Sequence, residues 1–216
     1  MERVTTEITY ITFILVSYIV ASISFGLLIG KLSKGIDIRE YGSGSTGATN
    51  VARNCGTAWG LLALILDMGK AAIPLYIAMY VVETPEWSHP IIGLSAIVGH
   101  SWPLFTNFKG GKGIASGWSA LIVLSPVSGI VAIISAAPIM VATRYVSLGS
   151  IVGSGVGGIC IVIISLTSNL PDIYCIYGFI GSSVTIVLHH KNILRLLRGE
   201  ESKFGKSDTT ETGNKI

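Results

Sequence analysis

The chain has 216 residues, of which half are hydrophobic and only 12% are charged. Soluble domains carry about 25% charged residues, so this composition, with a mean hydropathy of +0.66, excludes an ordinary soluble domain and predicts an all-α integral membrane protein. The net charge of +3 does not indicate nucleic-acid binding, because the basic residues follow the predicted membrane topology.

Helices that span a bilayer need about 20 mostly apolar residues. The clear candidates are Ile8–Leu32, Ala58–Val82, Leu148–Leu166 and Ile173–Leu188. Ile91–Leu104 is shorter and ends at Pro103, and Ser125-Pro126 divides the long apolar stretch between Gly113 and Thr143, because proline ends helices. We therefore expect seven transmembrane helices, or five if the short ones are re-entrant. The first run is too long for the apolar region of a signal peptide and lacks a clearly basic flank, so we expect it to be retained.

The charge distribution predicts an orientation for these helices. With seven crossings and the N-terminus outside, all Lys and Arg except Arg3 and Lys70 fall in inside loops, whereas Glu83, Glu86 and Asp172 lie in outside loops. This is a strong positive-inside pattern. It predicts a multi-pass protein of the plasma or inner membrane, with its C-terminus and polar motifs on the cytoplasmic side. Residues 1–206 form one transmembrane domain, and we expect the polar tail at 207–216 to be disordered.

The first polar motif is the run Tyr41–Arg53, which lies between two apolar segments. Its glycines free backbone N–H groups to converge on an anion, and Arg53 offers a planar, permanently charged fork. Four hydroxyls can donate further hydrogen bonds: Ser43, Ser45, Thr46 and Thr49. The motif therefore favours phosphate binding at a membrane surface, although a plain connecting loop is the alternative.

The second motif is Gly99-His100-Ser101-Trp102-Pro103, followed by Phe108-Lys109-Gly110-Gly111-Lys112-Gly113. It is not a Walker A sequence, because Thr106 stands where that motif needs glycine and Gly113 where it needs Ser or Thr. Two lysines around a Gly-Gly turn at the start of a helix can still bind an anion. Alternatively, Lys109 and Lys112 are only inside-facing topology charges.

The third motif, His189–Gly199, continues the last apolar segment. His189, Asn192 and Arg195 recur every three residues and share a helix face. A basic tail beside anionic lipid is the alternative for Arg195. Within the second span, Asp67 and Lys70 predict a buried i,i+3 pair or a support for the phosphate loop. A fourth polar patch contains Arg144, Ser147 and Ser150.

Together these motifs resemble the bacterial membrane glycerol-3-phosphate acyltransferases that use acyl phosphate as donor. That family has a glycine-serine loop ending in Ala-Thr-Asn and an arginine, matched by 42–53. It has Gly-His…Pro…Phe-Lys-Gly-Gly-Lys-Gly, matched by 99–113, and His-x-x-Asn-Ile-x-Arg-Leu-x-x-Gly, matched by 189–199. The chain departs from the family at two positions. The family often has asparagine where this chain has Ser45, and it often has Gly-Thr-Glu where this chain has Gly199-Glu200-Glu201.

The resemblance implies a monomer that transfers a fatty acyl group from acyl phosphate to the 1-hydroxyl of sn-glycerol 3-phosphate, at the first acylation step of phospholipid biosynthesis. The products are 1-acylglycerol 3-phosphate (lysophosphatidic acid) and inorganic phosphate. No cofactor or metal is implied, and the partners are the two substrates and the lipid bilayer.

The roles of individual residues follow from the same resemblance. Ser43, Thr49 and Arg53 are expected to hold the acyl phosphate, with help from Ser150. Lys112, His189 and Asn192 are expected to orient glycerol 3-phosphate, with Arg53 shared between the phosphates. The further substrate-binding positions are Gly42, Gly44, Asn50, Lys109, Gly110 and Gly111. The donor phosphate is expected to take the proton of the attacking hydroxyl, with His189 as the alternative general base.

Two other classes of protein remain open from the sequence. A transporter for a phosphorylated metabolite could use basic, glycine-interrupted segments, but the polar groups cluster on one face and the chain has no clear internal repeat. A non-catalytic lipid-binding scaffold leaves His189 and Asn192 unexplained.

Overall fold

The computed structural model describes residues 2–205, with side chains from residue 7 onward, and every regular element in this range is helical. The all-α fold class is therefore confirmed for that range, and the predicted tail at 207–216 lies outside it. In chain order the elements are α1 (Glu2–Ala21), α2 (Phe25–Lys34), η1 (Ile38–Glu40), α3 (Ala48–Cys55), α4 (Thr57–Tyr80), α5 (Ser88–Ser101), η2 (Leu104–Thr106), α6 (Ile114–Leu124), α7 (Pro126–Thr143), α8 (Val146–Thr167), η3 (Asp172–Tyr174), α9 (Cys175–Leu188) and α10 (His190–Leu197).

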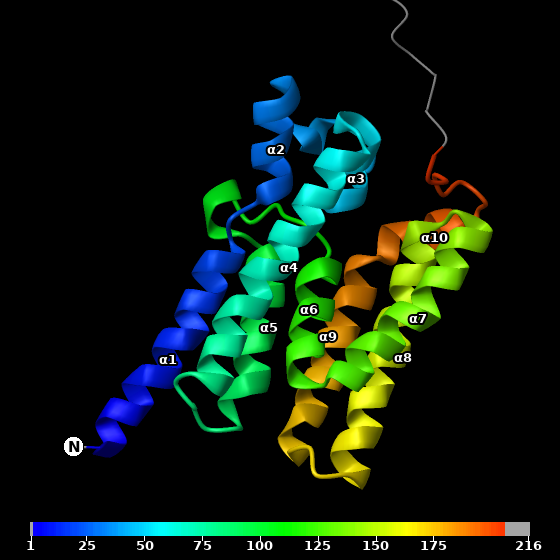
Figure 1. Ribbon diagram of the computed structural model, residues 1–216. Helices are drawn as coiled ribbons and strands as arrows, with labels where there is room; N and C mark the ends of the chain where they lie inside the picture. Colours follow the sequence, from blue (N-terminus) through cyan, green and yellow to red (C-terminus); the bar gives the residue numbers. More distant parts are fainter. Residues whose placement is uncertain (1, 206–216) are drawn as a thin grey trace, which may run out of the picture.

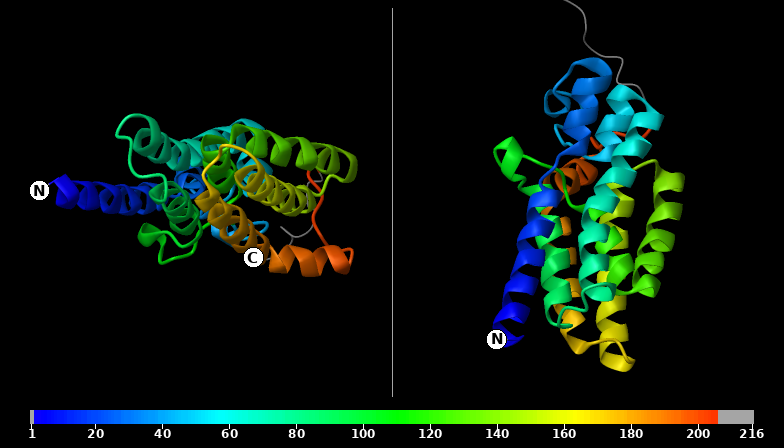
Figure 2. Two further views of the ribbon diagram at one scale, coloured as in Figure 1. Left: turned by 90° about the horizontal axis from the view of Figure 1, so that it is seen from below. Right: turned by 60° about the vertical axis from the view of Figure 1, so that its left-hand side comes forward.

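The long helices form a bundle in which the chain reverses direction at each connection (Figure 1). The helices α1, α5, α7 and α9 run toward the end that carries α2, α3 and α10, whereas α4, α6 and α8 run away from it. Figure 2 shows α1 at the edge of the bundle, with the N-terminus projecting at the opposite end. The connections that carry the three polar motifs therefore lie at one end of the molecule.

Several predicted helix ends match the structure. The break at Ser125-Pro126 is confirmed, because α6 ends at Leu124 and α7 begins at Pro126 with Ser125 as its N-cap. The predicted helix at 8–32 is not continuous: α1 ends at Ala21 and α2 begins at Phe25. At this break the Ser22 hydroxyl donates to the carbonyl of Tyr18 at 2.8 Å. Hydroxyls that bond to backbone carbonyls of the preceding turn often bend helices.

Four helical segments of the described chain are long and apolar enough to cross a membrane: Glu7–Lys34, Thr57–Tyr80, Pro126–Thr143 and Val146–Thr167. The segment Asp172–Leu188 with His190–Leu197, bent by 57°, would make a fifth if it counts as one span. The helix α6 is apolar but shorter. These findings agree with an integral membrane protein, and the count of seven crossings stays a prediction.

Small residues allow the helices to pack closely. On α8, a Cβ built on Gly153 would approach α7 at the carbonyl of Ala132 to 2.7 Å, and one on Gly157 would approach the Ala132 Cβ to 2.6 Å. Close backbone approach at small residues is typical of helix packing in membranes. Large apolar side chains such as Ile65, Ile134 and Ile159 instead point outward and are more than half exposed.

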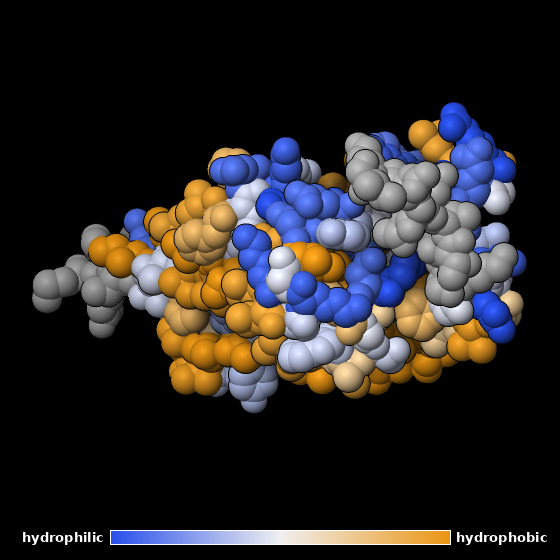
Figure 3. Space-filling model, turned by 90° about the horizontal axis from the view of Figure 1, so that it is seen from above, coloured by the Kyte–Doolittle hydropathy of each residue, from blue (hydrophilic) through white to orange (hydrophobic). Residues whose placement is uncertain are grey.

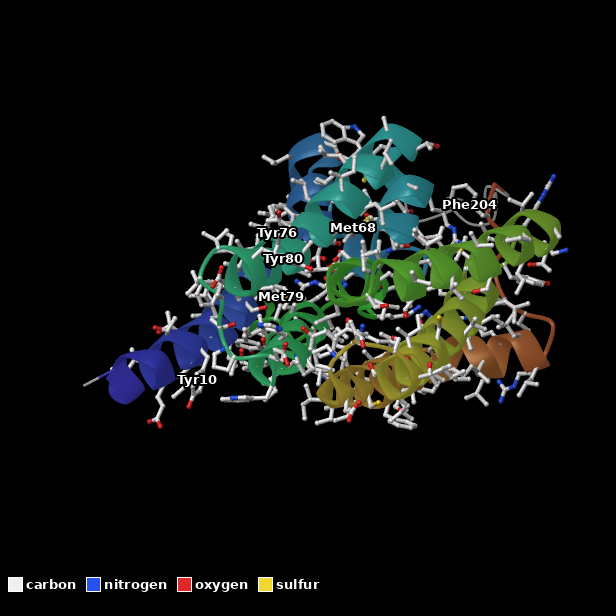
Figure 4. The ribbon with its side chains drawn as sticks, turned by 60° about the horizontal axis from the view of Figure 1, so that its bottom comes forward. Tyr10, Met68, Tyr76, Met79, Tyr80 and Phe204 are labelled. Atoms are coloured by element: carbon white, nitrogen blue, oxygen red, sulfur yellow. The ribbon has the colours of Figure 1, made fainter. Side chains whose placement is uncertain are left out.

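Aromatic side chains mark the end of the bundle opposite to the motifs. The rings of Tyr76 and Tyr80 on α4 lie 4.9 Å apart, and Tyr10 of α1 packs edge-on against Trp87 at 4.5 Å. Figure 4 shows Tyr10, Tyr76 and Tyr80 where α1 begins and α4 ends. Tyr and Trp are enriched where membrane spans meet the headgroup region, so this end is typical of a membrane interface.

Candidate active site

The polar motifs converge at the end of the bundle that carries α2, α3 and α10. Figure 3 shows this end from above as a hydrophilic surface bordered by hydrophobic side chains. The bundle therefore presents one polar surface directly beside the region where apolar side chains face outward.

One buried side chain, Asn50 of α3, organises the first motif. Its Nδ2 donates to three backbone carbonyls at 2.9 to 3.0 Å, those of Ile38, Tyr41 and Ser45. Its Oδ1 accepts from the backbone N–H of Ser43 and from Asn54 Nδ2, both at 3.1 Å. Both ends of the amide are thus occupied. Asn50, which we predicted to contact substrate, here holds the loop in shape.

The groups predicted to bind the acyl phosphate lie around this loop. Gly42 has a φ of 57°, and a Cβ there would overlap Asn50 Oδ1, so a larger residue cannot occupy this turn. Gly44 also has a positive φ, 68°. Ser43 is exposed, and Thr49 and Arg53 on α3 are partly exposed. The serine, the glycine turn and the arginine of this motif are therefore all at least partly accessible to solvent.

Lys112 connects the second motif to the third. It lies two residues before α6, and its Nζ donates to Asn192 Oδ1 on α10 at 2.6 Å. Burial lowers the pKa of Lys112 to about 8; the nearby charge of Glu201 opposes this shift, and those of Arg195 and Arg53 reinforce it. The influence of Arg53 places the first motif and Lys112 in one electrostatic environment. Lys112 and Arg53 are therefore near enough for their charges to interact, as neighbouring sites for two phosphates would require.

His189 lies at the junction of α9 and α10 and is buried. Its Nδ1 lies 2.7 Å from the carbonyl oxygen of Thr185. A carbonyl only accepts, so Nδ1 must carry the proton, and Nε2 of the neutral ring is left with a lone pair. Burial lowers the pKa of His189 to about 4, and the charge of Lys112 adds to this effect. The ring therefore stays neutral near pH 7 and can accept a hydrogen bond from a hydroxyl.

Glu201 is the residue that sequence reasoning missed. Its Oε1 accepts from Ser147 Oγ at 2.6 Å and from Asn192 Nδ2 at 2.7 Å, and its Oε2 pairs with Arg195 Nε at 2.7 Å. These hydrogen bonds hold the pKa of Glu201 below its usual value despite the cost of burial. The available signal in the sequence was a carboxylate in a strongly basic segment, two residues after Gly199, which follows α10.

Other predicted site residues lie apart from this network. Lys109 is exposed, and among the residues that the structure describes its side chain makes no hydrogen bond or ion pair with this network. Gly110 and Gly111 pack against His100. The hydroxyl of Ser150 donates within α8 to the carbonyl of Val146 at 2.9 Å, whereas Ser147 reaches the network. In the described part of the chain, no group of three or more His, Cys, Asp or Glu could hold a metal ion.

Comparison with known proteins identifies relatives of this architecture. A family model described as glycerol-3-phosphate acyltransferase matches residues 11–199. A glycerol-3-phosphate acyltransferase of Desulforamulus reducens is 39% identical over 203 residues, covering 94% of this chain and 99% of the relative. Two crystal structures of PlsY (YgiH), an integral membrane glycerol 3-phosphate acyltransferase, are 34% identical and cover 91% of this chain and 96% of theirs. The TM-score is 0.84 for the glycerol 3-phosphate form and 0.82 for the lysophosphatidic acid form.

Proposed function

Because this chain belongs to the glycerol-3-phosphate acyltransferase family, we propose that it acylates the 1-hydroxyl of sn-glycerol 3-phosphate with acyl phosphate as donor. The products are lysophosphatidic acid and inorganic phosphate. Membership of an acyltransferase family favours an enzyme over the two other classes considered from the sequence, a transporter and a lipid-binding scaffold. The donor, the residue roles, the monomeric state and the cytoplasmic position of the site are parts of this proposal.

The observation that carries the proposal is that two groups of residues which we predict to bind anions lie at one end of an apolar bundle. One set is the loop 41–47 with Ser43, Thr49 and Arg53, and the other contains Lys112, His189 and Asn192. Acyl phosphate and glycerol 3-phosphate each bring one phosphate, so two neighbouring sets fit two phosphorylated substrates. The apolar surface beside them suits a fatty acyl chain whose phosphate stays at the polar end.

In the proposed reaction the 1-hydroxyl oxygen attacks the acyl carbonyl carbon, and the bond between that carbon and the phosphate oxygen breaks. Acyl phosphate is already an activated donor, so the protein mainly positions both substrates and stabilises the charge that develops. Arg53 and the backbone N–H groups of the glycine loop suit the departing phosphate. Lys112 suits the phosphate of the acceptor.

The proton of the attacking hydroxyl goes to the donor phosphate in this proposal. An effective general base has a pKa near the working pH, whereas burial lowers the pKa of His189 to about 4, which does not suit the ring to that role near pH 7. The Nε2 lone pair of His189 instead accepts a hydrogen bond from the hydroxyl and orients its oxygen. Lys112 and Asn192 fix the acceptor from the other side.

The proposal also places this site on the cytoplasmic side of the plasma or inner membrane, after seven crossings by α1, α4, α5, α6, α7, α8 and α9. The alternating directions of these helices (Figure 1) and the positive-inside charge pattern support this topology. Labelling of single cysteines at positions 83 and 200 from each side of sealed vesicles would test it, because the two positions are expected on opposite sides.

The direct test is release of inorganic phosphate by purified protein given palmitoyl phosphate, with and without sn-glycerol 3-phosphate. We expect release that requires both substrates and disappears in Arg53→Ala. Arg198→Ala is the matched control, because Arg198 is an exposed arginine at the same end of the helix bundle (Figure 1) but outside the proposed site. Formation of lysophosphatidic acid from palmitoyl-CoA or palmitoyl-acyl carrier protein, but not from palmitoyl phosphate, would contradict the choice of donor.

A further inference from the structure

A second buried polar cluster lies beside the proposed site and has no role in the reaction described above. It contains Asp67 and Lys70 of α4 and His100 of α5, each 5% exposed or less. Lys70 Nζ lies 2.7 Å from Asp67 Oδ1, which confirms the predicted i,i+3 pair. His100 Nδ1 lies 3.7 Å from the same oxygen. Buried charges are costly unless they are paired, so the position of this cluster calls for an explanation.

The cluster ties three other parts of the chain to α4. Lys70 Nζ also donates to the carbonyl of Ile23 at 2.7 Å, in the break between α1 and α2. Ser116, in the first turn of α6, donates through its hydroxyl to the backbone carbonyl of Asp67 at 3.1 Å. Through His100, the cluster reaches the end of α5. It therefore lies where the connection 102–113 leaves α5 and enters α6.

The turn before Lys112 packs directly on His100. The backbone N–H of Gly111 donates to the carbonyl of His100 at 3.1 Å. A Cβ built on Gly111 would overlap Nε2 of the His100 ring, whereas a Cβ built on Gly110 would overlap the His100 carbonyl and approach Pro103 Cδ to 2.6 Å. The ring thus faces Gly111, and the backbone of His100 faces Gly110. No side chain larger than hydrogen fits at either position.

We propose that His100, held beside Asp67, is a positioning residue that sets the path of the Gly110-Gly111 turn and thereby the place of Lys112. Lys112 follows this turn directly, and Gly113 after it has a φ of 78° and packs beside Ile97. The backbone of Lys112 is therefore fixed on both sides before its ammonium reaches Asn192. This inference rests on the proposed function, because it assigns the turn's effect to binding of glycerol 3-phosphate.

The two glycines provide a matched test, because only one of them meets the His100 ring. Wild type and five variants are assayed for phosphate release over a range of glycerol 3-phosphate concentrations. The single variants are Gly111→Ala, Gly110→Ala and His100→Ala, and the double variants combine His100→Ala with Gly111→Ala or with Gly110→Ala. We expect Gly111→Ala to raise KM for glycerol 3-phosphate about tenfold or more, because misplacing a binding group by about 1 Å can cost 10²-fold. The KM for palmitoyl phosphate should change less than threefold.

The KM of the double variant for glycerol 3-phosphate distinguishes positioning by His100 from a simple loss of structure. With the ring removed, Gly111→Ala should cost less than about twofold beyond His100→Ala alone, because the overlapping atom is gone. Gly110→Ala should raise KM by the same factor in wild type and in His100→Ala, because a Cβ at Gly110 meets the His100 backbone and Pro103, which both remain. The proposal would be overturned if Gly111→Ala raised KM by the same factor with and without the His100 ring. It would also be overturned if removal of the ring reduced the effect of Gly110→Ala as much as that of Gly111→Ala.

If His100→Ala does not yield folded protein, His100→Asn replaces it, because the shorter amide keeps a polar group near Asp67 while removing Nε2. The same non-additivity is expected, and its absence would count against the proposal in the same way. Inactive wild-type protein would instead refute the proposed function, so the two failures are distinguishable.

Discussion

The lowered pKa of Lys112 leads to a specific pH dependence. If the ammonium binds the phosphate of glycerol 3-phosphate, kcat/KM for this substrate should follow the charged fraction of Lys112. The shift from 10.5 to about 8 corresponds to about 3 kcal/mol lost from the charged form. With a pKa of about 8, the charged fraction falls about 20-fold between pH 7.5 and 9.5, whereas an ordinary lysine would lose less than about a fifth of its charge.

The assay is the initial rate of phosphate release at limiting glycerol 3-phosphate, measured between pH 7 and 9.5 with saturating palmitoyl phosphate. The acceptor phosphate, with a second pKa of about 6, stays doubly charged across this range. In Lys112→Arg the decline should disappear, even if the overall rate is lower, because arginine keeps its charge. In Lys109→Arg, a lysine of the same loop that is exposed, the decline should persist.

Unfolding would not produce this profile through Lys112. Its pKa is lower in the folded chain than in the unfolded one, so between pH 8 and 10.5 the unfolded state binds more protons at this site. The contribution of Lys112 to stability is therefore smallest below pH 8 and grows as the pH rises to 10.5. Activity and this contribution change in opposite directions. A flat kcat/KM up to pH 9.5, or the same decline in Lys112→Arg, would refute the reasoning.

Three further changes test other parts of the site. Glu201→Gln removes the charge that pairs with Arg195 and should lower the free energy of unfolding by about 2 kcal/mol. The measurement is the midpoint of thermal unfolding in detergent, and an unchanged midpoint would contradict the central role of Glu201 in the network. Asn50→Ala leaves three backbone carbonyls without their hydrogen-bond donor, so KM for palmitoyl phosphate should rise about tenfold or more. A larger rise in KM for glycerol 3-phosphate would argue against the role of Asn50 in shaping the loop that binds the acyl phosphate. His189→Gln should retain most of kcat under substrate-assisted proton transfer, whereas a loss of about 10²-fold with binding intact would indicate a general base.

The sequence predicted the features that depend on local patterns. Long apolar segments indicated membrane helices, and Pro126 divided two of them at the position seen in the structure, because proline cannot continue the preceding helix. The three motifs supplied the family resemblance, which the comparisons confirmed. Asp67 and Lys70 were expected to pair because residues three apart share a helix face.

Only the tertiary structure showed how these groups meet. Lys112 and Asn192 are 80 residues apart, and Ser147 and Glu201 are 54 apart, so no local pattern predicts either bond. The inward role of Asn50, the ring of His100 beneath Gly111 and the central place of Glu201 likewise depend on which helices pack together. Hydropathy and turn signals act over a few neighbouring residues, whereas hydrogen-bond partners in a bundle are chosen by the packing of helices far apart in the chain.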